Sequence, residues 1–258
     1  MKKLVALLLT LVVVLSFVAC NSSNNDDNTN EAFLSMTAEQ YENAKIKSEG
    51  VMTYAEYVAA AIDSNVVVEV YVQATQSWYD GKITVYAADL DGAYFLYNMA
   101  CAEEDAAKLT AGTKIKVTGK KITWSGEIEV GDATFEFVNK ENDTYVAPAL
   151  KINSVVGKDA LVNYQNALVN FAGAKIVAQD DGAAIKYKGG ERGDDVYFKA
   201  EVNGTVVSFC IERYLTGPDT DVYKAVEALK VGDVVDIQGF LYWYEGAEPH
   251  VTSVTAAK

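Results

Sequence analysis

One stretch of this 258-residue chain recurs about 120 residues further on, and this repeat constrains the fold more than any other feature. "LTAGTKIKVTGKKITWSGEIEV" begins at Leu109, and "LKVGDVVDIQGFLYWYEGAEPHV" begins at Leu229. Three glycine pairs match at a shift of 120, namely Gly112/Gly232, Gly119/Gly239 and Gly126/Gly246. Upstream, "LDGAYFLYNM" matches "VNGTVVSFCI" and "YDGKITVY" matches "DDGAAIKY". An internal repeat of this kind indicates a repeated structural unit. We therefore predict two copies of one domain, at 66–146 and 165–258, joined by a linker at 147–164.

The second copy is longer than the first, and we attribute the difference to two insertions. One is "KGGERGDDVYF", placed after the second strand of that copy, and the other surrounds "TGPD". In the first copy, alternation with a period of two predicts a half-buried strand from Val66 onward. "KITVYAADL" and "AYFLYNMAC" follow as strands, and Asp80-Gly81 and Asp91-Gly92 are typical of hairpin turns. A short helix, "AEEDAAKL", and two more strands complete the unit.

Before the first unit, residues 36–65 form a predicted helical segment. Thr37 with Gln40, and Thr53 with Glu56, have the spacing of capping boxes at helix starts.

The order of three strands, a helix and two strands resembles the OB-fold. Both "LTAGTKIKVTG" and "LKVGDVVDIQG" carry the pattern of glycines and hydrophobic residues that opens the fourth strand of this fold. The resemblance implies a mainly β protein with two consecutive five-stranded barrels, each with a short helix between strands 3 and 4, preceded by short N-terminal helices. The chain is similar, in general, to uncharacterised bacterial cell-surface lipoproteins with tandem OB-like domains. The OB-fold hosts many functions, so the resemblance alone does not give one.

The N-terminal sequence "MKKLVALLLTLVVVLSFVAC" has a charged start and an apolar stretch too short for a comfortable membrane span. Its ending resembles a lipobox, which implies a signal peptide at 1–19 and a lipid on Cys20. The polar residues 20–35 are typical of a disordered tether. We therefore expect an exported protein, lipid-anchored to the outer face of the bacterial cytoplasmic membrane or to the cell surface. An ordinary secretory signal with a chance cysteine is the alternative.

The chain is strongly acidic, with a net charge of −14. Removal of Lys2 and Lys3 with the signal peptide leaves 20 basic and 36 acidic residues, or −16. Such a charge repels polyanions, and we therefore expect nucleic acid to be an unlikely partner. One basic run in the first unit could nevertheless form a nucleic-acid patch beside Trp124, and its members are Lys114, Lys116, Lys120 and Lys121. The second unit does not repeat it.

Catalytic and metal-binding patterns are absent from the sequence. His250 is the only histidine, it follows Pro249, and no nucleophile motif accompanies it, so we expect it at a strand edge or on the surface. Cys101 and Cys210 form no metal motif and are interpreted as two buried thiols, although a disulfide between them stays open. Acidic pairs such as Asp194-Asp195 lack calcium-loop spacing. We expect no enzymatic activity, no metal and no cofactor.

Aromatic residues are the best candidates for a binding surface. The candidate ligand-binding residues are Trp78, Tyr79, Tyr86, Tyr97, Trp124 and Trp243. Strict alternation places Trp78 inside the first barrel and Tyr79 outside, but a bulge would reverse this. We expect an extracytoplasmic binding protein whose aromatic surface and acidic rim take a glycan, a peptide or an envelope protein. The alternative is a lipoprotein that binds single-stranded nucleic acid, or assists a nuclease, through the lysine patch.

Overall fold

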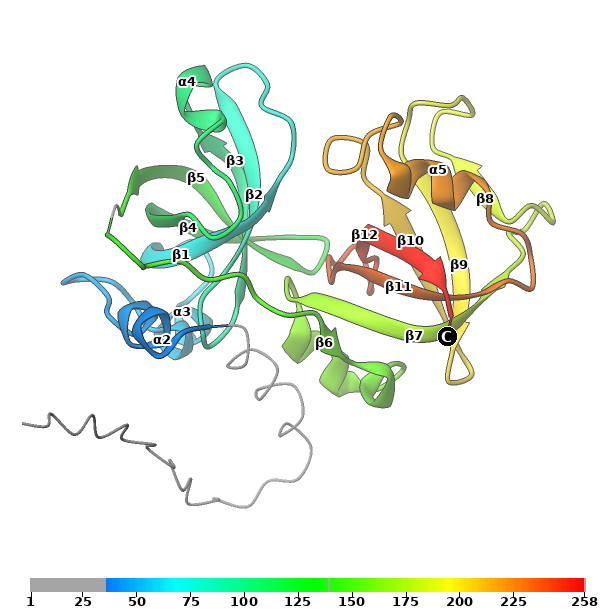
Figure 1. The fold of residues 1–258 in the computed structure, drawn as a ribbon, viewed down its shortest axis with the longest axis horizontal. Coiled ribbons are helices and arrows are strands. Elements are labelled where there is room, and N and C mark those ends of the chain that lie inside the picture. The colour runs from blue at the N-terminus through cyan, green and yellow to red at the C-terminus, as the bar shows by residue number, and fades with distance from the viewer. Residues whose placement is uncertain (1–35, 139, 258) are drawn as a thin grey trace, which may run out of the picture.

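The computed structural model describes residues 36–138 and 140–257 and shows two β-barrels side by side (Figure 1). The N-terminal half builds one barrel, and the C-terminal half builds the other. This architecture confirms the prediction of a mainly β chain with two five-stranded barrels and few short helices.

Barrel 1 is a closed ring of five strands in the order β1-β2-β3-β5-β4. The strands are β1 (Asn65–Thr75), β2 (Lys82–Ala88), β3 (Ala93–Ala100), β4 (Lys114–Trp124) and β5 (Glu127–Phe137). All pairings are antiparallel except β3 with β5, which closes the ring in parallel. The short helix α4 (Glu103–Ala106) lies between β3 and β4 in the chain, as the OB-like order predicts.

Barrel 2 repeats the same ring with β7 (Leu168–Val177), β9 (Val196–Val202), β10 (Thr205–Ile211), β11 (Val234–Phe240) and β12 (His250–Ala256). A pairing between β7 and β9 closes it, and β10 pairs with β12 in parallel, like β3 with β5. Helix α5 (Asp221–Glu227) lies between β10 and β11.

One sequence match in barrel 2 is wrong. "DDGAAIKY" was matched to the second strand, but its strand β8 (Ile185–Tyr187) pairs only with β9 at the outer edge of the sheet. The second-strand place in the ring belongs to β9, whose first residues were assigned to an insertion. A turn signal followed by apolar residues occurs before both strands, so local sequence could not separate them.

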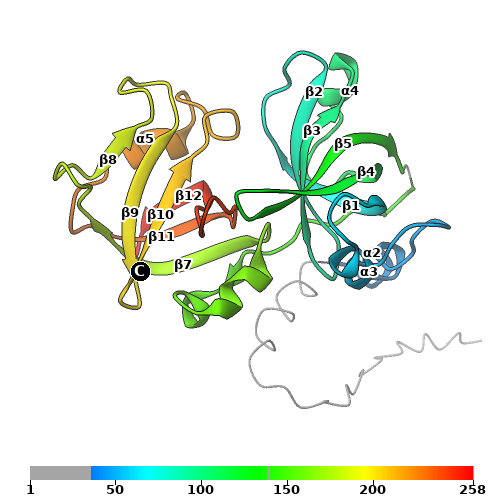
Figure 2. The same cartoon turned by 180° about the vertical axis from the view of Figure 1, so that it is seen from behind.

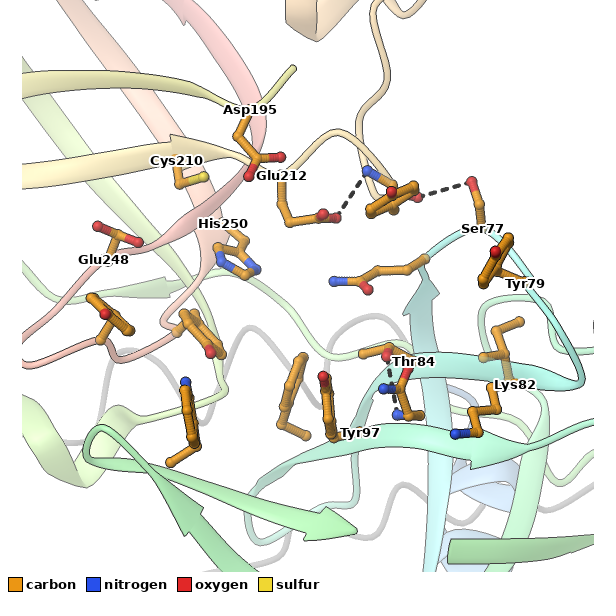
Figure 3. A pocket seen from close by; sticks show the side chains of 18 of the residues that line it. Ser77, Tyr79, Lys82, Thr84, Tyr97, Asp195, Cys210, Glu212, Glu248 and His250 are labelled. Atoms are coloured by element: carbon orange, nitrogen blue, oxygen red, sulfur yellow. Dashed lines mark hydrogen bonds between the residues drawn. The ribbon is translucent and has the colours of Figure 1, made fainter. Parts of the chain in front are cut away.

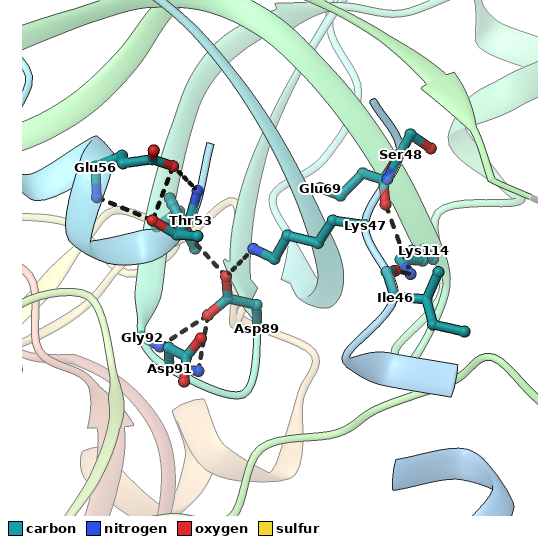
Figure 4. Close-up of polar contacts among 11 residues, drawn as sticks. Ile46, Lys47, Ser48, Thr53, Glu56, Glu69, Asp89, Asp91, Gly92 and Lys114 are labelled. Carbon is teal, nitrogen blue, oxygen red and sulfur yellow. Dashed lines mark hydrogen bonds and ion pairs between the residues drawn. The ribbon is translucent and has the colours of Figure 1, made fainter. Parts of the chain in front are cut away.

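The predicted capping boxes form at both N-terminal helices, α2 (Ala38–Ala44) and α3 (Tyr54–Ala59). After α2, the chain docks on barrel 1 through partly buried polar contacts (Figure 4). Lys47 Nζ lies 2.6 Å from Asp89 Oδ2, and the Ser48 amide donates to Glu69 Oε1 at 3.2 Å. The segment therefore belongs to barrel 1.

The repeated glycines meet two different steric needs. Gly112 and Gly232 adopt φ of +87° and +96°, which side-chain-bearing residues rarely do. A Cβ at Gly119 would lie 2.8 Å from the Gly131 carbonyl oxygen, and one at Gly239 would lie 2.6 Å from that of His250. The first pair shapes a turn, and the second lets neighbouring strands approach closely.

Each barrel has its own apolar core, and a smaller aromatic cluster joins the two. Tyr86 of β2 stacks on Phe240 of β11 with ring centroids 4.4 Å apart. Backbone contacts add to this, since the Ser77 amide donates to the Tyr214 carbonyl at 2.8 Å and the Glu245 amide donates to the Ser125 carbonyl at 2.7 Å. Seen from behind, the β4–β5 hairpin of barrel 1 reaches across to barrel 2 (Figure 2).

The chain between the barrels contains β6 (Leu150–Lys151) and two 3-10 helices, η1 (Asn153–Val155) and η2 (Asp159–Tyr164). Within residues 36–138 and 140–257, no helix combines the length and apolar character needed to cross a membrane. The expected signal peptide, the tether and Cys20 lie outside the described residues.

Candidate ligand cleft between the barrels

A cleft of about 910 Å³ opens between the barrels on the side where β2, β3 and the β4–β5 hairpin face β10 and β12 (Figure 3). Its walls combine aromatic rings with carboxyl, hydroxyl and amide groups. Barrel 1 contributes Gln76, Ser77, Tyr79, Asp80, Lys82, Ile83, Thr84, Phe95, Tyr97, Asn98 and Trp124. Barrel 2 contributes Lys188, Asp195, Tyr197, Cys210, Glu212, Tyr214, Tyr242, Tyr244, Glu248 and His250.

The exposed aromatic rings of the described chain gather in this cleft. Among the described residues, five aromatic side chains are exposed, and all five line the cleft: Tyr79 (80%), Trp124 (63%), Tyr214 (48%), Tyr244 (48%) and Tyr97 (44%). Large exposed rings are unfavourable in water, and their concentration on one concave surface is typical of binding sites. Trp124 and Tyr244 occupy matching places in the repeat at a shift of 120, so both barrels supply a ring from the same turn.

Local turn chemistry explains the position of Tyr79. Asp80 and Gly81 have φ of 47° and 75°, and Tyr79 and Lys82 exchange two backbone hydrogen bonds at 3.0 Å. This is the predicted two-residue hairpin, and it holds Tyr79 at the cleft mouth. Upstream, the register of β1 shifts between Val72 and Ala74, which is a bulge.

The bulge turns the end of β1 toward barrel 2. Unbroken alternation from Val66, which puts Trp78 inside barrel 1, also puts Ala74 and Gln76 on that inner face. Instead, Ala74 packs in the inter-barrel cluster, and Gln76 Nε2 donates to Tyr86 Oη at 3.2 Å. The bulge thus places an amide side chain at the cleft floor.

Carboxyl groups on barrel 2 form the polar side of the cleft. Burial raises the pKa of Glu212 to about 7 and raises that of Glu248 above its usual range. Glu212 Oε2 is held by the Tyr214 and Leu215 amides at 3.0 and 2.8 Å. Asp195 accepts from the Arg213 amide at 3.0 Å and from Lys188 Nζ at 3.1 Å. The cleft therefore offers fixed hydrogen-bond acceptors beside its rings.

His250 lies at the floor of the cleft, where the two barrels meet. It is only 6% exposed, so the expectation of a surface or strand-edge histidine is wrong with respect to burial. Its ring stacks on Tyr242 at 4.2 Å, and Nδ1 lies 2.5 Å from Tyr86 Oη of barrel 1. Burial lowers the pKa of His250 to about 3, so the imidazole is neutral at physiological pH. Sequence could not show this, because part of the cover, Tyr86, comes from the other barrel.

Three of the six predicted aromatic residues, Tyr79, Tyr97 and Trp124, line the cleft. The other three are held inside the fold. Trp78 packs against the barrel 1 core and donates through Nε1 to the Cys101 carbonyl at 2.9 Å. Tyr86 is 1% exposed in the inter-barrel cluster, and Trp243 packs against the barrel 2 core. These three have structural contacts that account for their rings.

The predicted lysine patch is dispersed by the structure. Lys114 is 4% exposed, lies 3.0 Å from Asp143 and donates to the Ile46 carbonyl at 2.9 Å (Figure 4). Lys121 is 6% exposed and donates to three carbonyls of the α3 segment at 2.7 to 3.0 Å. Lys116 pairs with Glu136, and Lys120 is exposed. Lys114 and Lys121 are thus removed from any phosphate-binding surface, because each stabilises the fold from a buried position.

The two thiols of the described chain are free and buried. Cys101 belongs to barrel 1 and Cys210 lines the cleft floor from barrel 2. Within the described residues, no group of three or more histidine, cysteine, aspartate or glutamate side chains is placed to hold a metal ion.

Sequence reasoning missed several residues of the cleft, chiefly Tyr214, Tyr242, Tyr244, Glu212, Glu248 and His250. The recurrence of rings before the same turn was a signal for Tyr244. For Glu212 and Tyr214 the sequence carries no signal, since their place in the cleft depends on how the barrels meet.

No protein-family model matches the chain, and no curated protein sequence matches it. Among solved structures, the Ifi202 HINa domain in complex with 20-bp dsDNA is similar at 14% identity and a TM-score of 0.35, covering 74% of this chain and 98% of that chain. The p202 HIN1 in complex with 12-mer dsDNA has 16% identity and a TM-score of 0.33, with 82% and 94% covered. A murine DNA-binding protein bound to dsDNA has 13% identity and a TM-score of 0.36, with 74% and 96% covered. The two-barrel architecture itself rests on the strand pairings of this chain.

These complexes correct one expectation from the sequence, namely that nucleic acid is an unlikely partner. The expectation rested on the net charge of −14. Structures similar to this chain are solved with double-stranded DNA bound. We therefore withdraw the expectation.

Proposed function

We propose that this chain is a binding protein whose ligand lies in the cleft between the two barrels and stacks on its aromatic rings. The observation that supports this most is the gathering of all five exposed aromatic side chains of the described residues on that one concave surface. Binding, rather than catalysis, is the activity that this arrangement favours. Both barrels contribute lining residues to the cleft, so the proposed site needs the two barrels together.

The chemistry of the cleft is best matched by a glycan. Pyranose rings present flat C–H faces that pack on aromatic rings, and their hydroxyl groups need hydrogen-bond acceptors nearby. The cleft supplies Tyr79, Tyr97 and Trp124 on one side, and Glu212 and Glu248 on the other. The carboxylates would fix the orientation of a sugar whose affinity comes from stacking.

Nucleic acid is the second candidate, and the same rings favour it. Bases stack on exposed aromatic side chains independently of sequence, and this is a common mode of single-strand binding by OB-folds. The exposed lysines at the cleft are Lys82 and Lys188. Similar solved structures hold DNA, as described above. In this reading the strand would run along the cleft, with Lys82 near its phosphates.

A direct binding assay separates these candidates. The probes are hexasaccharides of β-1,4-linked glucose and of β-1,4-linked N-acetylglucosamine, a 12-nucleotide oligo-dT strand and a 12-bp DNA duplex. Trp124→Ala should lower the affinity for the probe that binds by about tenfold, because truncating a central ring removes a stacking contact. Val206→Ala is the matched control, since Val206 is 54% exposed outside the cleft. A glycan reading requires binding that is insensitive to salt, whereas a nucleic-acid reading requires affinity that falls steeply with salt. If no probe binds, or if both variants bind like wild type, the proposal fails.

We further propose that the protein acts outside the cytoplasm, anchored by a lipid on Cys20, as the N-terminal sequence favours. Mass spectrometry of the protein expressed in a bacterium should find an acylated cysteine at the mature N-terminus. Cys20→Ala should release the protein from the membrane fraction. Retention of Met1 or an unmodified Cys20 would contradict this proposal.

A further inference from the structure

A hydrogen-bonded relay crosses from one barrel to the other at the cleft floor. Gln76 Nε2 donates to Tyr86 Oη at 3.2 Å, and Tyr86 Oη lies 2.5 Å from His250 Nδ1. A hydroxyl group has one proton to donate. The buried Tyr86 hydroxyl accepts from Gln76 and still needs an acceptor for its own proton, and His250 Nδ1 lies within hydrogen-bond distance of it. In that arrangement Nδ1 accepts, and the neutral ring carries its proton on Nε2.

The Nε2–H group is left for a ligand. Nδ1 is engaged, and within the described residues Nε2 makes no hydrogen bond to the protein. Three fully buried side-chain polar atoms of the described chain lack a partner, namely Tyr57 Oη, Glu127 Oε1 and Asn170 Oδ1. Nε2 is not among these atoms, although the residue as a whole is 94% buried, and His250 lines the cleft. This nitrogen therefore opens onto the cleft.

The ring is also fixed in orientation. Tyr242 stacks on one face at 4.2 Å with an interplanar angle of 20°, and Tyr86 meets it nearly edge-on at 6.0 Å and 74°. A donor whose position is set by packing and by a second hydrogen bond loses little entropy when a ligand binds. Tyr86 contacts the ring from barrel 1. The titratable groups of barrel 2 that line the cleft with it are Lys188, Asp195, Tyr197, Cys210, Glu212, Tyr214, Tyr242, Tyr244 and Glu248.

The neighbours of Nε2–H define the group that fits there. Figure 3 shows the Glu212 and Glu248 side chains on either side of His250. A single donor between two acceptors suits a ligand with adjacent hydroxyls, one accepting from His250 and the others donating to the carboxyl groups. An anion brings no hydroxyl protons to the carboxyl oxygens, and above about pH 7 the charge of Glu212 repels it.

We propose that His250 is a specificity-determining residue of the cleft, whose Nε2–H donates to a hydroxyl oxygen of a neutral, polyhydroxylated ligand, and that Tyr86 of the opposite barrel fixes the tautomer. This inference rests on the proposed function and adds to it the identity of one contact and the class of the contacting group. Tyr86 acts as a positioning residue, since it touches His250 and not the ligand.

The ligand-free protein provides the first test, because the chain has one histidine and its ring nitrogens give a single set of NMR signals. A long-range ¹H–¹⁵N spectrum at neutral pH should show Nδ1 as an unprotonated nitrogen and Nε2 as a protonated one. In Tyr86→Phe, which keeps the ring that stacks on Phe240, the signals should move toward a mixture of both tautomers. A wild-type ring protonated on Nδ1, or doubly protonated, overturns the inference. A Tyr86→Phe spectrum identical to wild type overturns the role of Tyr86.

The second test measures binding of the glucose hexasaccharide and the oligo-dT strand. His250→Phe keeps an aromatic ring against Tyr242 but removes the donor, and it should weaken hexasaccharide binding about tenfold. His250→Gln restores an N–H donor and should recover part of that loss. If a probe binds equally well to wild type and His250→Phe, the inference fails and the proposed function stands. If neither wild-type nor variant protein binds any probe, both fail, whatever the tautomer.

Discussion

The two barrels have the same strand ring and contribute different chemistry to the cleft. Both present aromatic rings, but barrel 2 alone adds the carboxyl groups of Glu212 and Glu248 and the imidazole of His250. Where the two copies agree in sequence, as at Gly119 and Gly239, the residues serve the fold. Where they differ, some residues serve one barrel alone, as Lys114 does, and others line the cleft, as Glu212 and His250 do. In this tandem repeat, the unrepeated positions are therefore a better guide to function than the repeated ones.

The largest effect is expected at a position where the copies differ inside barrel 1. Lys114 is buried between Asp143 and Glu69, while Val234 stands at the matching place in barrel 2 and is 49% exposed. Lys114→Met should lower the free energy of unfolding by about 3–5 kcal/mol, because it leaves buried carboxylates unpaired. Val234→Ala should change it by less than about 0.5 kcal/mol. Urea denaturation measures both, and a small loss for Lys114→Met would mean that this lysine is not structural.

The next effect concerns the β4–β5 hairpin, through which barrel 1 contacts barrel 2. Burial raises the pKa of Glu127 to about 8 and that of Glu129 to about 7, and Glu127 Oε2 accepts from the Trp243 amide at 2.8 Å. At the matching place barrel 2 has Ala247. Because the folded state holds these protons more tightly than the unfolded chain, the stability that the two carboxyls contribute is greatest below about pH 5 and falls as pH rises from about 5 to 8. Each carboxyl contributes about 1.4 kcal/mol for every pH unit in its window.

His250 acts in the opposite direction over part of this range. Its pKa of about 3 in the folded protein lies below the ordinary value of 6.5, so its contribution is full above about pH 6.5 and is lost as pH falls toward 3. Between pH 5 and 7, the stability lost by the three carboxyls of Glu127, Glu129 and Glu212 as pH rises exceeds the stability gained by this one histidine. Thermal unfolding from pH 5 to 8 should show the net decline, and Glu127→Gln should flatten it. Glu141→Gln, at an exposed position, is the control, and a melting temperature that rises with pH would contradict this account.

A smaller effect tests the positions at which the barrels agree. Gly119→Ala and Gly239→Ala should each destabilise the protein by about 1–3 kcal/mol, because the new methyl group meets the carbonyl of a neighbouring strand. Similar losses would show that the repeat has one steric role in both barrels. Gly239→Ala also displaces the His250 carbonyl and should weaken binding in the cleft, whereas Gly119→Ala should not. Equal effects of the two variants on binding would break the distinction between the barrels.

Local signals in the sequence predicted much of the fold. The capping boxes at Thr37 and Thr53, the turn at Asp80-Gly81 and the repeated glycines each depend on contacts within a few residues or on one strand pair. The sequence left a bulge in the first strand open but could not place it after Val72, because no residue type specifies it. The role of β9 was obscured by the similar turn before β8.

The cleft was predictable only in part, for a physical reason. Tyr79 and Trp124 follow from turns, so their exposure could be anticipated. Lys114 and His250 were expected to be exposed, but both are buried by distant segments. The chain after α2 covers Lys114, and Tyr86 of barrel 1 covers His250. Such burial depends on long-range packing, which a single sequence does not display.

The most direct test of the central claim asks whether one ligand needs both barrels. Dissociation constants for the best-binding probe should be measured with wild type, Trp124→Ala from barrel 1, Glu212→Gln from barrel 2, and Val206→Ala as the control. The account predicts that Trp124→Ala and Glu212→Gln each weaken binding, by about tenfold for the ring, while Val206→Ala binds like wild type. Loss of affinity confined to the variant of one barrel would contradict a shared cleft.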